Sequence, residues 1–439
     1  MVLDIPELSL VILMGPSGSG KSTFAGKHFK PTEVLSSDFC RGLICDDKDN
    51  QDATKDAFDV LHVITRKRLA MGKLTVVDAA NVRLEDRKPL ITLAREFHCV
   101  PVAIIFDLPA ELCQQRNCAR NDRDITNRVV VQQAGELRRG LRGLKREGFR
   151  HIHRFCSQGD AEAAVVKRQP LYCNLRHEYG PFDIIGDVHG CCGELEELLG
   201  KLGYEVVEKR EGLLLDGGPV YCHPQGRKTV FLGDLVDRGP RVLDTVRLAS
   251  NMVRGGAAIC LPGNHDMRLV RLLRGAEMEL TYGLDKTVDE LQRLPDGVRE
   301  EFSRQAASFF GSLVSHAVLY DGKLVAAHAG MKEQMQGRDS TSVREFALVG
   351  ETTGETDECG LPVRYDWAPS YSGRATVVYG HTSVFDAEWV NNTINIDTGC
   401  VFGRKLTALR YPEMELVSVP AKRPYHRTSP KPSSPAPPG

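Results

Sequence analysis

ILMGPSGSGKSTF, residues 12–24, places three glycines, a lysine and several hydroxyl residues directly after an apolar run. The run Leu10 to Met14 predicts a buried strand, and a helix is expected from Ser22 onward. The spacing between them matches the phosphate-loop pattern G-x-x-x-x-G-K-S/T. Glycines let backbone N–H groups surround phosphate oxygens, and the N-terminus of a helix adds positive potential. The stretch therefore predicts a nucleoside triphosphate site at the edge of a parallel sheet.

Within this loop, Lys21 can bridge the β- and γ-phosphates while the Ser22 hydroxyl can ligate Mg²⁺. The residues expected to hold the nucleotide are Gly15, Ser17, Gly18, Ser19, Gly20, Lys21, Ser22 and Thr23. The alternative is a glycine-rich turn that binds nothing. That alternative is disfavoured, because the pattern arises by chance in only about one or two of a hundred such chains.

Charged residues downstream complete a kinase-like site. Asp38 follows a second apolar stretch in VLSSDFCR, and a carboxylate there can accept the proton of an attacking hydroxyl. Asp78 ends a further strand in VVDAAN and is a candidate for supporting the Mg²⁺ ion. A candidate lid in RNCARNDR carries three arginines at helical spacing, Arg116, Arg120 and Arg123. For Asp38 the alternative interpretation is a helix cap or a surface turn. For Asp78 it is an ordinary carboxylate at a strand end, and for the three arginines it is a solvated helix face.

Length and composition indicate a multidomain globular protein. The chain has 439 residues, is 41% hydrophobic and 26% charged, and carries a net charge of −1, which disfavours a broadly cationic nucleic-acid binder. Its 13 cysteines include no C-x-x-C pair, and its first residues lack a basic segment, so we expect a cytoplasmic protein with reduced thiols. The predicted parts are residues 1–157, a connector at 158–180, a second domain at 181–420 and a disordered Pro-rich tail at 421–439.

The second domain carries polar clusters that each follow an apolar β-type run. They lie in DIIGDVHG, VFLGDLVDRGP, ICLPGNHD, LVAAHAG and TVVYGHT. Clusters at the carboxyl ends of strands gather at one rim of a sheet. Oxygen ligands mixed with imidazoles suit two divalent metals such as Mn²⁺, which activate a bridging water in phosphoester hydrolysis. A structural role for all five clusters is the disfavoured alternative.

The order of these motifs resembles the metallophosphoesterase superfamily, and the resemblance assigns roles. It implies metal ligands at Asp187, His189, Asp234, Asn264, His328 and His381, with Asp234 bridging the two ions. It implies that Arg238 grips the substrate phosphate and that His265, oriented by Asp266, protonates the leaving group.

Both domains together resemble the bacterial polynucleotide kinase-phosphatase family, on GPSGSGKST, SSDFCR, GPFDIIGDVHG and NIDTGCVFG. The fold implied is a P-loop parallel-sheet kinase domain followed by an α/β metallophosphoesterase domain, a mixed-sheet sandwich flanked by helices. The activities implied are ATP-dependent phosphorylation of 5′-hydroxyl ends and removal of 3′-phosphate or 2′,3′-cyclic phosphate ends, with RNA or DNA ends as partners. Asp38 would be the base, Arg41 would contact the acceptor, Arg116 and Arg123 the nucleotide phosphates, and Asp397 would belong to the phosphatase site.

Two departures from that family stand out. No K-x-D-G ligase motif occurs, so sealing would belong to a separate protein, and a ligase or methyltransferase of a repair system is a possible partner. Arg404 stands where a second glycine is expected after VFG, which calls the local turn and substrate access into question.

Two other functions stay open. The phosphoesterase could act on dinucleoside polyphosphates or phosphoproteins while the kinase serves a small-molecule acceptor. Alternatively, the protein is a nucleotide-regulated interaction module with weak turnover.

Overall fold

The computed structural model describes residues 1–119, 126–356 and 362–426. The chain divides into two compact units, one of residues 1–171 with 338–340 and one of residues 172–337 with 341–439. Within the described residues, no helix combines the length and the apolar composition needed to cross a bilayer.

The first unit is built on a five-stranded parallel sheet. Its strands, in spatial order, are β3 (Val34–Ser36), β4 (Thr75–Asp78), β2 (Ser9–Met14), β5 (Val100–Phe106) and β6 (His151–Phe155). Every residue of β2 is buried, which explains its continuous apolar sequence. The predicted central strand and the parallel sheet are confirmed.

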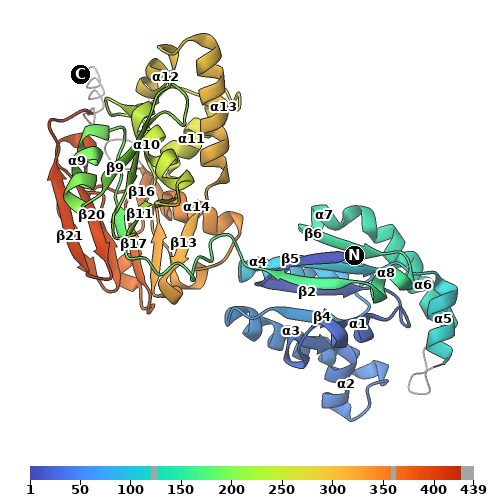
Figure 1. The fold of residues 1–439 in the computed structure, drawn as a ribbon. Helices are drawn as coiled ribbons and strands as arrows, with labels where there is room; N and C mark the ends of the chain where they lie inside the picture. The colour runs from blue at the N-terminus through green and yellow to red at the C-terminus, as the bar shows by residue number, and fades with distance from the viewer. Residues whose placement is uncertain (120–125, 357–361, 427–439) are drawn as a thin grey trace, which may run out of the picture. The chain divides into compact units, whose positions relative to one another are not determined.

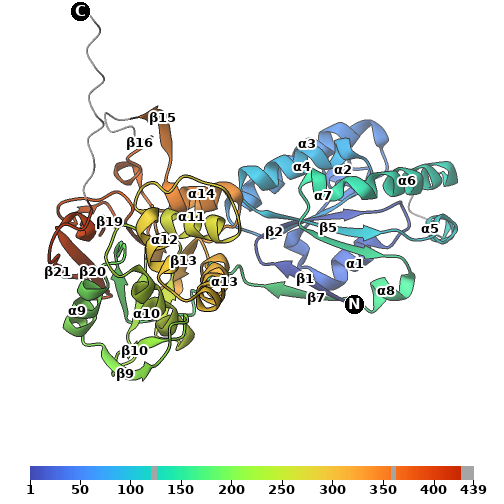
Figure 2. The same ribbon diagram turned by 90° about the horizontal axis from the view of Figure 1, so that it is seen from above.

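Helices cover both faces of this sheet. They are α1 (Lys21–His28), α2 (Ser37–Cys45), α3 (Thr54–Ala70), α4 (Leu84–Glu96), α5 (Ala110–Cys118), α6 (Asn127–Gly140), α7 (Leu144–Glu147) and α8 (Gln158–Glu162). In Figure 2, α3 and α4 lie on one side of the sheet and α1 on the other. The phosphate loop connects β2 to α1, as the sequence predicts.

The connector predicted at 158–180 is wrong in its first half. Residues 158–162 form α8, and β7 (Val165–Gln169) pairs in parallel with β1 (Val2–Pro6). Most of β7 is exposed, so its sequence lacks the apolar run by which a buried strand is recognised. The first unit therefore extends to residue 171.

The tail prediction needs a similar correction. Residues 427–439 lie outside the described part of the chain. Before them, the backbone N–H of Lys422 and the hydroxyl of Tyr425 both donate to Glu194 Oε1, at 3.0 and 2.7 Å. These two hydrogen bonds to one carboxylate, which lies far away in the sequence, hold Lys422 and Tyr425 in place. The Pro-rich composition assigns both residues to the disordered tail.

The second unit contains two five-stranded sheets. The first has the order β12 (Ala258–Cys260), β11 (Lys228–Phe231), β8 (Phe182–Ile185), β20 (Lys405–Tyr411) and β21 (Glu415–Pro420). The other has the order β13 (His316–Leu319), β14 (Leu324–Ala327), β17 (Thr376–Tyr379), β19 (Thr393–Asn395) and β18 (Trp389–Val390). In each sheet, the three strands that the predicted site residues follow run parallel to one another. They are β8, β11 and β12 in the first sheet and β14, β17 and β19 in the other.

Side chains that alternate along the strands pack the two sheets against each other and against helices outside them. Figure 1 shows these helices beside the strands of the second unit. Ile184 and Val230 pack in one core with Leu324 and Val378 of the other sheet, whereas Ile185 packs in a second core with the helices. The flanking helices are α9 (Cys192–Leu202) and α10 (Val242–Arg254), with α14 (Thr341–Val349) on the outer face of the other sheet. The result is the predicted sandwich flanked by helices.

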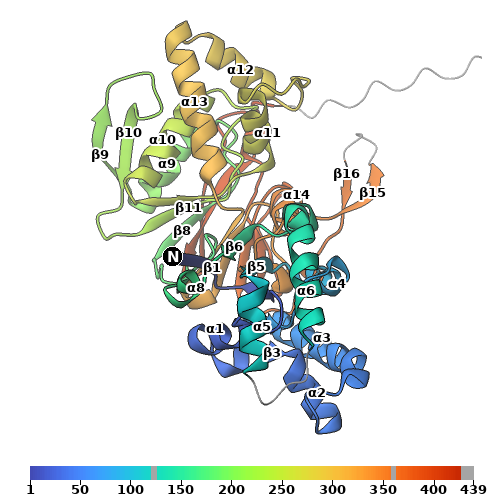
Figure 3. The same cartoon turned by 90° about the vertical axis from the view of Figure 1, so that its right-hand side faces the viewer.

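The remaining elements surround this sandwich. They are the ribbon β9 (Glu205–Arg210) with β10 (Gly218–Cys222), the helices α11 (Asn264–Leu273), α12 (Leu284–Gln292) and α13 (Asp296–Ser312), and the hairpin β15 (Thr352–Thr356) with β16 (Pro362–Arg364). Figure 3 shows α12 and α13 beside α11, and β15 and β16 projecting from the rest of the second unit.

Candidate active sites

The phosphate loop has the backbone that its sequence predicts. Gly20 adopts a left-handed conformation, φ 91°, directly before α1. A Cβ on Gly18 would stand 2.2 Å from the carbonyl oxygen of Cys113, so only glycine lets α5 pack on the loop. The ammonium of Lys21 donates to the carbonyl oxygens of Gly15 and Pro16, at 2.8 and 2.9 Å. Lys21 is thus held at the mouth of the loop.

Cavities lie on both sides of this loop. One, of about 290 Å³, brings Lys21 and Ser22 together with Asp38, Arg41 and Asp78. The Arg41 guanidinium lies 3.1 Å from Asp38 Oδ1, and its buried Nε has no hydrogen-bond partner among the described residues. The other, of about 420 Å³, is lined by Gly18, Thr23, Phe24, Phe106 and Arg116. The first cavity gathers charged side chains around the loop, and the second includes two phenylalanine rings.

Only one of the three predicted lid arginines lies in the described part of the chain. Arg116 is on α5 and lines the second cavity, whereas Arg120 and Arg123 lie outside the described residues. Ser17 and Gly18 line these cavities with the rest of the loop, and the Ser17 N–H donates to Gln133 Oε1 at 2.8 Å.

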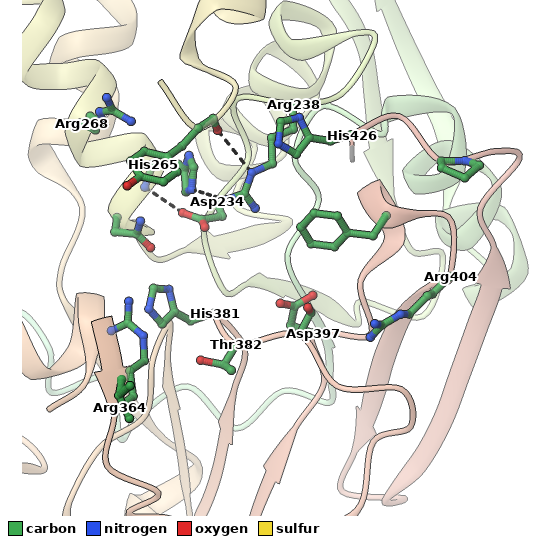
Figure 4. Close-up of a pocket in the computed structure, with 16 residues that line it drawn as sticks. Asp234, Arg238, His265, Arg268, Arg364, His381, Thr382, Asp397, Arg404 and His426 are labelled. Carbon is green, nitrogen blue, oxygen red and sulfur yellow. Dashed lines mark hydrogen bonds between the residues drawn. The ribbon is translucent and has the colours of Figure 1, made fainter. Parts of the chain in front are cut away.

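In the second unit, the strand ends converge as the sequence predicts (Figure 4). Asp187, Asp234 and Asn264 follow the parallel strands β8, β11 and β12, and His328, His381 and Asp397 follow β14, β17 and β19. The carboxyl ends of parallel strands share one edge of a sheet, so the two sheets bring two sets of side chains to one place.

Asp234 stands at the centre of these side chains. Its Oδ2 lies 3.5 Å from His189 Nε2 and 3.5 Å from His328 Nε2. Two groups of potential ligand atoms share it: His189, Asp234 and His265, and Asp234, His328 and His381, the atoms of each lying within 4.8 Å of one another. A carboxylate common to two groups is placed to bridge two cations.

The imidazole tautomers fit metal binding. Nδ1 of His328 lies 3.1 Å from the carbonyl oxygen of Leu232, so it carries the proton and Nε2 presents a lone pair. That Nε2 lies 3.1 Å from Asn264 Oδ1, which also carries no proton. His189 likewise has Nδ1 2.9 Å from the carbonyl oxygen of Val236. Facing lone pairs repel unless a cation lies between them, so these residues fit a metal centre.

Asp187 adds an uncompensated carboxylate to this centre. Its Oδ2 accepts the backbone N–H of His381 at 3.1 Å, and its buried Oδ1 has no hydrogen-bond partner among the described residues. A Cβ at Gly380 would stand 2.3 Å from Oδ1, which explains the glycine before His381. Burial raises the pKa of Asp187 well above its usual range, and the charges of Asp397 and Asp234 act in the same direction. A divalent cation would relieve this repulsion.

The other ionisable groups are in ligand-competent forms. Burial lowers the pKa of His189, His328 and His381, which keeps these imidazoles neutral. Burial alone would raise the pKa of Asp234, but positive charge on the surrounding imidazoles, His328 first, would lower it overall. The charge of the carboxylate and the protonation of these imidazoles are thus linked.

The predicted pairing of His265 with Asp266 is wrong. His265 Nδ1 lies 2.7 Å from Asp237 Oδ2, and Thr287 Oγ1 donates to the other oxygen of Asp237 at 2.6 Å. Asp266 instead accepts the backbone N–H groups of Leu235 and Gly263, at 2.9 and 2.8 Å. As the third residue of α11, Asp266 caps its own helix, and its carboxylate points away from the imidazole.

Several site residues have strained backbones. His189, Asp234, Asp237, Arg238 and His381 all have positive φ, between 46° and 72°. Side chains disfavour this region, and such residues cluster where the surrounding structure fixes functional groups. The strain supports a functional site at this edge.

Arg238 and Asp397 are brought to the same cavity, of about 1150 Å³. The Arg238 guanidinium donates to Nε2 of His189 and of His265, at 2.8 and 2.9 Å. Burial raises the pKa of Asp397 to about 6, although the Gly399 N–H and the Arg238 and Arg404 guanidinium groups act in the opposite direction. Arg404 does not disturb the turn, because Gly399 and Gly403 supply its left-handed positions, φ 68° and 91°.

Several residues at or beside this site have no role that the sequence motifs predict. Asp237 lies in VFLGDLVDRGP without a role being assigned to it, and no motif marks Arg268, Tyr282 or Arg364. All but Asp237 line the 1150 Å³ cavity. Spacing identifies residues that follow strands, but Arg364 comes from the β15–β16 hairpin.

Comparisons with known proteins match each unit separately. The family model described as an AAA domain matches residues 10–143, and the calcineurin-like phosphoesterase model matches residues 180–417. Curated relatives named asymmetrical bis(5′-nucleosyl)-tetraphosphatase PrpE match about half of the chain. Those from Anoxybacillus flavithermus and Bacillus subtilis are 46% and 43% identical over 244 residues, each spanning 56% of this chain and 96% of the relative.

A third such relative, from Halalkalibacterium halodurans, is 47% identical over 247 residues, which cover 55% of this chain and 95% of the relative. None of these three alignments spans much more than half of the chain. With its family model matched over residues 180–417 and its polar strand ends gathered around Asp234, the chain belongs to the calcineurin-like phosphoesterase family.

Proposed function

We propose that the second unit hydrolyses a phosphoanhydride bond of dinucleoside polyphosphates, and that the first unit transfers a phosphate from ATP to a hydroxyl acceptor. The observation that carries the first half is the 1150 Å³ cavity above Asp234, which four arginines line, Arg238, Arg268, Arg364 and Arg404. This is one alternative from the sequence, and the names of the relatives support it over nucleic-acid end healing.

Size and charge favour a polyphosphate in this cavity. Ligand cavities are usually about 300–1,000 Å³, so this one has room for a chain of phosphates. Each guanidinium group can donate two parallel hydrogen bonds to phosphate oxygens, and it stays positively charged. Both properties suit a substrate with several negative charges. A single phosphoryl group would need fewer cations than the cavity provides.

Residues of the chain divide the work of hydrolysis. Asp187, His189, Asp234, Asn264, His328 and His381 would hold two divalent cations, such as Mn²⁺. The cations, when bound, supply Lewis acidity and lower the pKa of a water. Arg238 would bind the phosphate that is attacked. Once that phosphate draws Arg238 away from His265, Nε2 is free to move a proton while Asp237 holds Nδ1.

In the first unit, Lys21 and Ser22 would hold the phosphates and Mg²⁺ of ATP, with Arg116 close to them. Asp38 would accept the proton of the attacking hydroxyl, and Arg41 would contact the acceptor. The acceptor cavity is small, about 290 Å³, which fits a small molecule or the end of a longer one.

The second candidate function is the healing of nucleic-acid ends. It is favoured by one observation: a kinase-like cavity and a phosphoesterase cavity occur on one chain. Phosphorylation of 5′-hydroxyl ends and removal of 3′-phosphates would then prepare RNA or DNA ends for a separate ligase. A repair methyltransferase would be a further possible partner.

A panel of substrates separates the candidates. The full chain with Lys21→Ala isolates the second unit, and the chain with Asp234→Asn isolates the first. Each is assayed with diadenosine tetraphosphate, a 3′-phosphate RNA, the matching DNA and a phosphopeptide. Fastest hydrolysis of the dinucleotide by Lys21→Ala supports the proposal, and fastest hydrolysis of a 3′-phosphate end transfers the function to end healing. The Asp234→Asn protein with ATP and a 5′-hydroxyl RNA tests the kinase half.

A further inference from the structure

Arg364 and Arg404 differ from the other cations of the 1150 Å³ cavity in having unused donors. In each, Nη1 is buried and has no hydrogen-bond partner among the described residues. Arg238, in contrast, donates to His189, His265 and the carbonyl oxygen of Tyr282. A buried N–H without a partner is destabilising, and more so when it is charged, so such donors indicate an absent ligand.

The same signature occurs at the other site. The buried arginine nitrogens without a partner, among the residues that the structure describes, belong to Arg41, Arg364 and Arg404. Arg41 lines the phosphate-loop cavity, and the other two line the cavity of the second unit. Unsatisfied guanidinium donors therefore coincide with cavities that are built for phosphate.

The two arginines lie on opposite sides of the metal site. Figure 4 shows Arg364 beside His381, and Arg404 beside Asp397. A phosphate chain that crosses the site would meet one of them in each direction.

Arg404 is also held in place before a ligand arrives. Its guanidinium lies 3.8 Å from the ring centroid of Phe385, whose side chain is 76% exposed. Stacking on an aromatic ring fixes the plane of the guanidinium while leaving its N–H groups free for phosphate oxygens. This explains why an arginine can stand after the VFG turn.

We propose that Arg364 and Arg404 form two anion subsites that hold the phosphates on either side of the one attacked, so that the site selects an internal position of a polyphosphate chain. The proposal deepens the proposed function and rests on it for the identity of the substrate. Phe385 is a positioning residue for Arg404.

Binding of inorganic phosphates tests these subsites without hydrolysis of a nucleotide. The probes are tripolyphosphate, in its non-hydrolysable imido form, and orthophosphate, measured by calorimetry with the same excess of Mn²⁺ in every sample. All proteins are full chains that carry Lys21→Ala, which removes the phosphate-loop contribution. The variants are Arg364→Gln, Arg404→Gln, Arg404→Lys and Phe385→Ala, and the control is Arg304→Gln, whose side chain is 70% exposed and paired with Glu301.

Each arginine-to-glutamine change should weaken tripolyphosphate binding about 10-fold or more, because it removes a charge-assisted hydrogen bond. Orthophosphate binding should change less than about 2-fold. Arg404→Lys should retain part of the affinity, Phe385→Ala should lose part, and Arg304→Gln should match the parent. Melting temperatures identify any variant that fails to fold. If Arg404→Gln fails to fold, the conservative variant Arg404→Lys tests the same subsite.

Equal losses for both probes would overturn the proposal, because the arginines would then act on the central phosphate. An absence of loss for tripolyphosphate would overturn it as well. If the expected losses occur but the protein does not cleave diadenosine tetraphosphate, the subsites stand and the proposed function falls. Failure of the proposal and failure of the function are thus distinguishable.

Discussion

At the scale of single residues, the phosphoesterase site depends on which carboxylate reaches which imidazole. Asp237 and Asp266 both lie next to predicted site residues, and spacing alone does not decide between them. The structure decides through local geometry: the third position of α11 turns Asp266 back to the helix start, and Asp237 reaches His265 Nδ1 at 2.7 Å. The capping pattern was present in GNHD, so this part could have been predicted.

Replacing Asp237 by asparagine tests the role of this pair. We expect Asp237→Asn to lower turnover by about 10²-fold, because an uncharged amide replaces the carboxylate that fixes the tautomer of His265. The loss should be larger for a 3′-phosphate, whose alkoxide leaving group needs a proton, than for a phosphoanhydride. Steady-state kinetics with both substrates measure it.

Asp266→Asn serves as the contrast. It should lower the melting temperature, since Asp266 accepts two backbone N–H groups, while leaving the ratio of the two turnover numbers unchanged. A shift of that ratio by Asp266→Asn, and none by Asp237→Asn, would reverse the assignment.

In the first unit, Asp38 is expected to act in phosphate transfer more than in nucleotide binding. Asp38→Asn keeps the shape of the side chain but removes the proton acceptor, so transfer should fall by about 10²-fold while ATP affinity persists. Single-turnover transfer and ATP titration separate the two quantities. Transfer at the rate of the parent would remove Asp38 from the mechanism.

At the scale of elements, the placement of the site follows from strand direction. Motifs after β8, β11, β12, β14 and β17 meet because each set of strands is parallel, and apolar runs made those strands predictable. Elements without such runs were missed. The exposed β7 resembles a linker, and β16 brings Arg364 to the cavity without any motif. Their positions depend on tertiary pairing, which short polar sequences do not reveal.

The strand β7 gives a pH-dependent prediction. Arg168 donates to both oxygens of Glu33, at 2.9 and 2.6 Å. Burial alone would raise the pKa of Glu33, but Arg168 and the Lys30 N–H lower it below its ordinary value of 4.5. The stabilisation is therefore present above pH 4.5 and is lost as the pH falls through the lower, folded pKa.

Arg168→Gln should therefore lower the free energy of unfolding by about 1 kcal/mol at neutral pH and by much less in acid. Hydrogen exchange of amide groups in β1 and β7 reports on this pairing in the full chain. Arg66→Gln, at a more exposed pair with Glu96, is the control and should have little effect. A difference between Arg168→Gln and the parent that grows in acid would contradict the sign.

At the scale of the whole molecule, the chain carries two sites in two compact units, each with its own core. The phosphate loop and the five phosphoesterase motifs were sufficient to predict both folds. The substrate was not predictable from them, because metal ligands report the chemistry and leave the size of the substrate open. That information lies in the cavity and in arginines such as Arg268 and Arg364, which no motif marks.

The two activities should be separable by single substitutions. Lys21→Ala should abolish phosphate transfer and leave hydrolysis near the parent rate, and Asp234→Asn should do the reverse, because the two side chains lie in different cavities. Transfer and hydrolysis are measured on the same preparations. Loss of both activities in either folded variant would show that the two sites depend on each other.

The most direct test of the central claim is a competition between substrates. Diadenosine tetraphosphate and a 3′-phosphate RNA of equal concentration are incubated with the Lys21→Ala chain and Mn²⁺, and the ratio of their kcat/KM values is read from the two products. We expect a ratio of at least about 10 in favour of the dinucleotide, because the two flanking subsites each contribute a charge-assisted hydrogen bond. A ratio in favour of the 3′-phosphate RNA would contradict it.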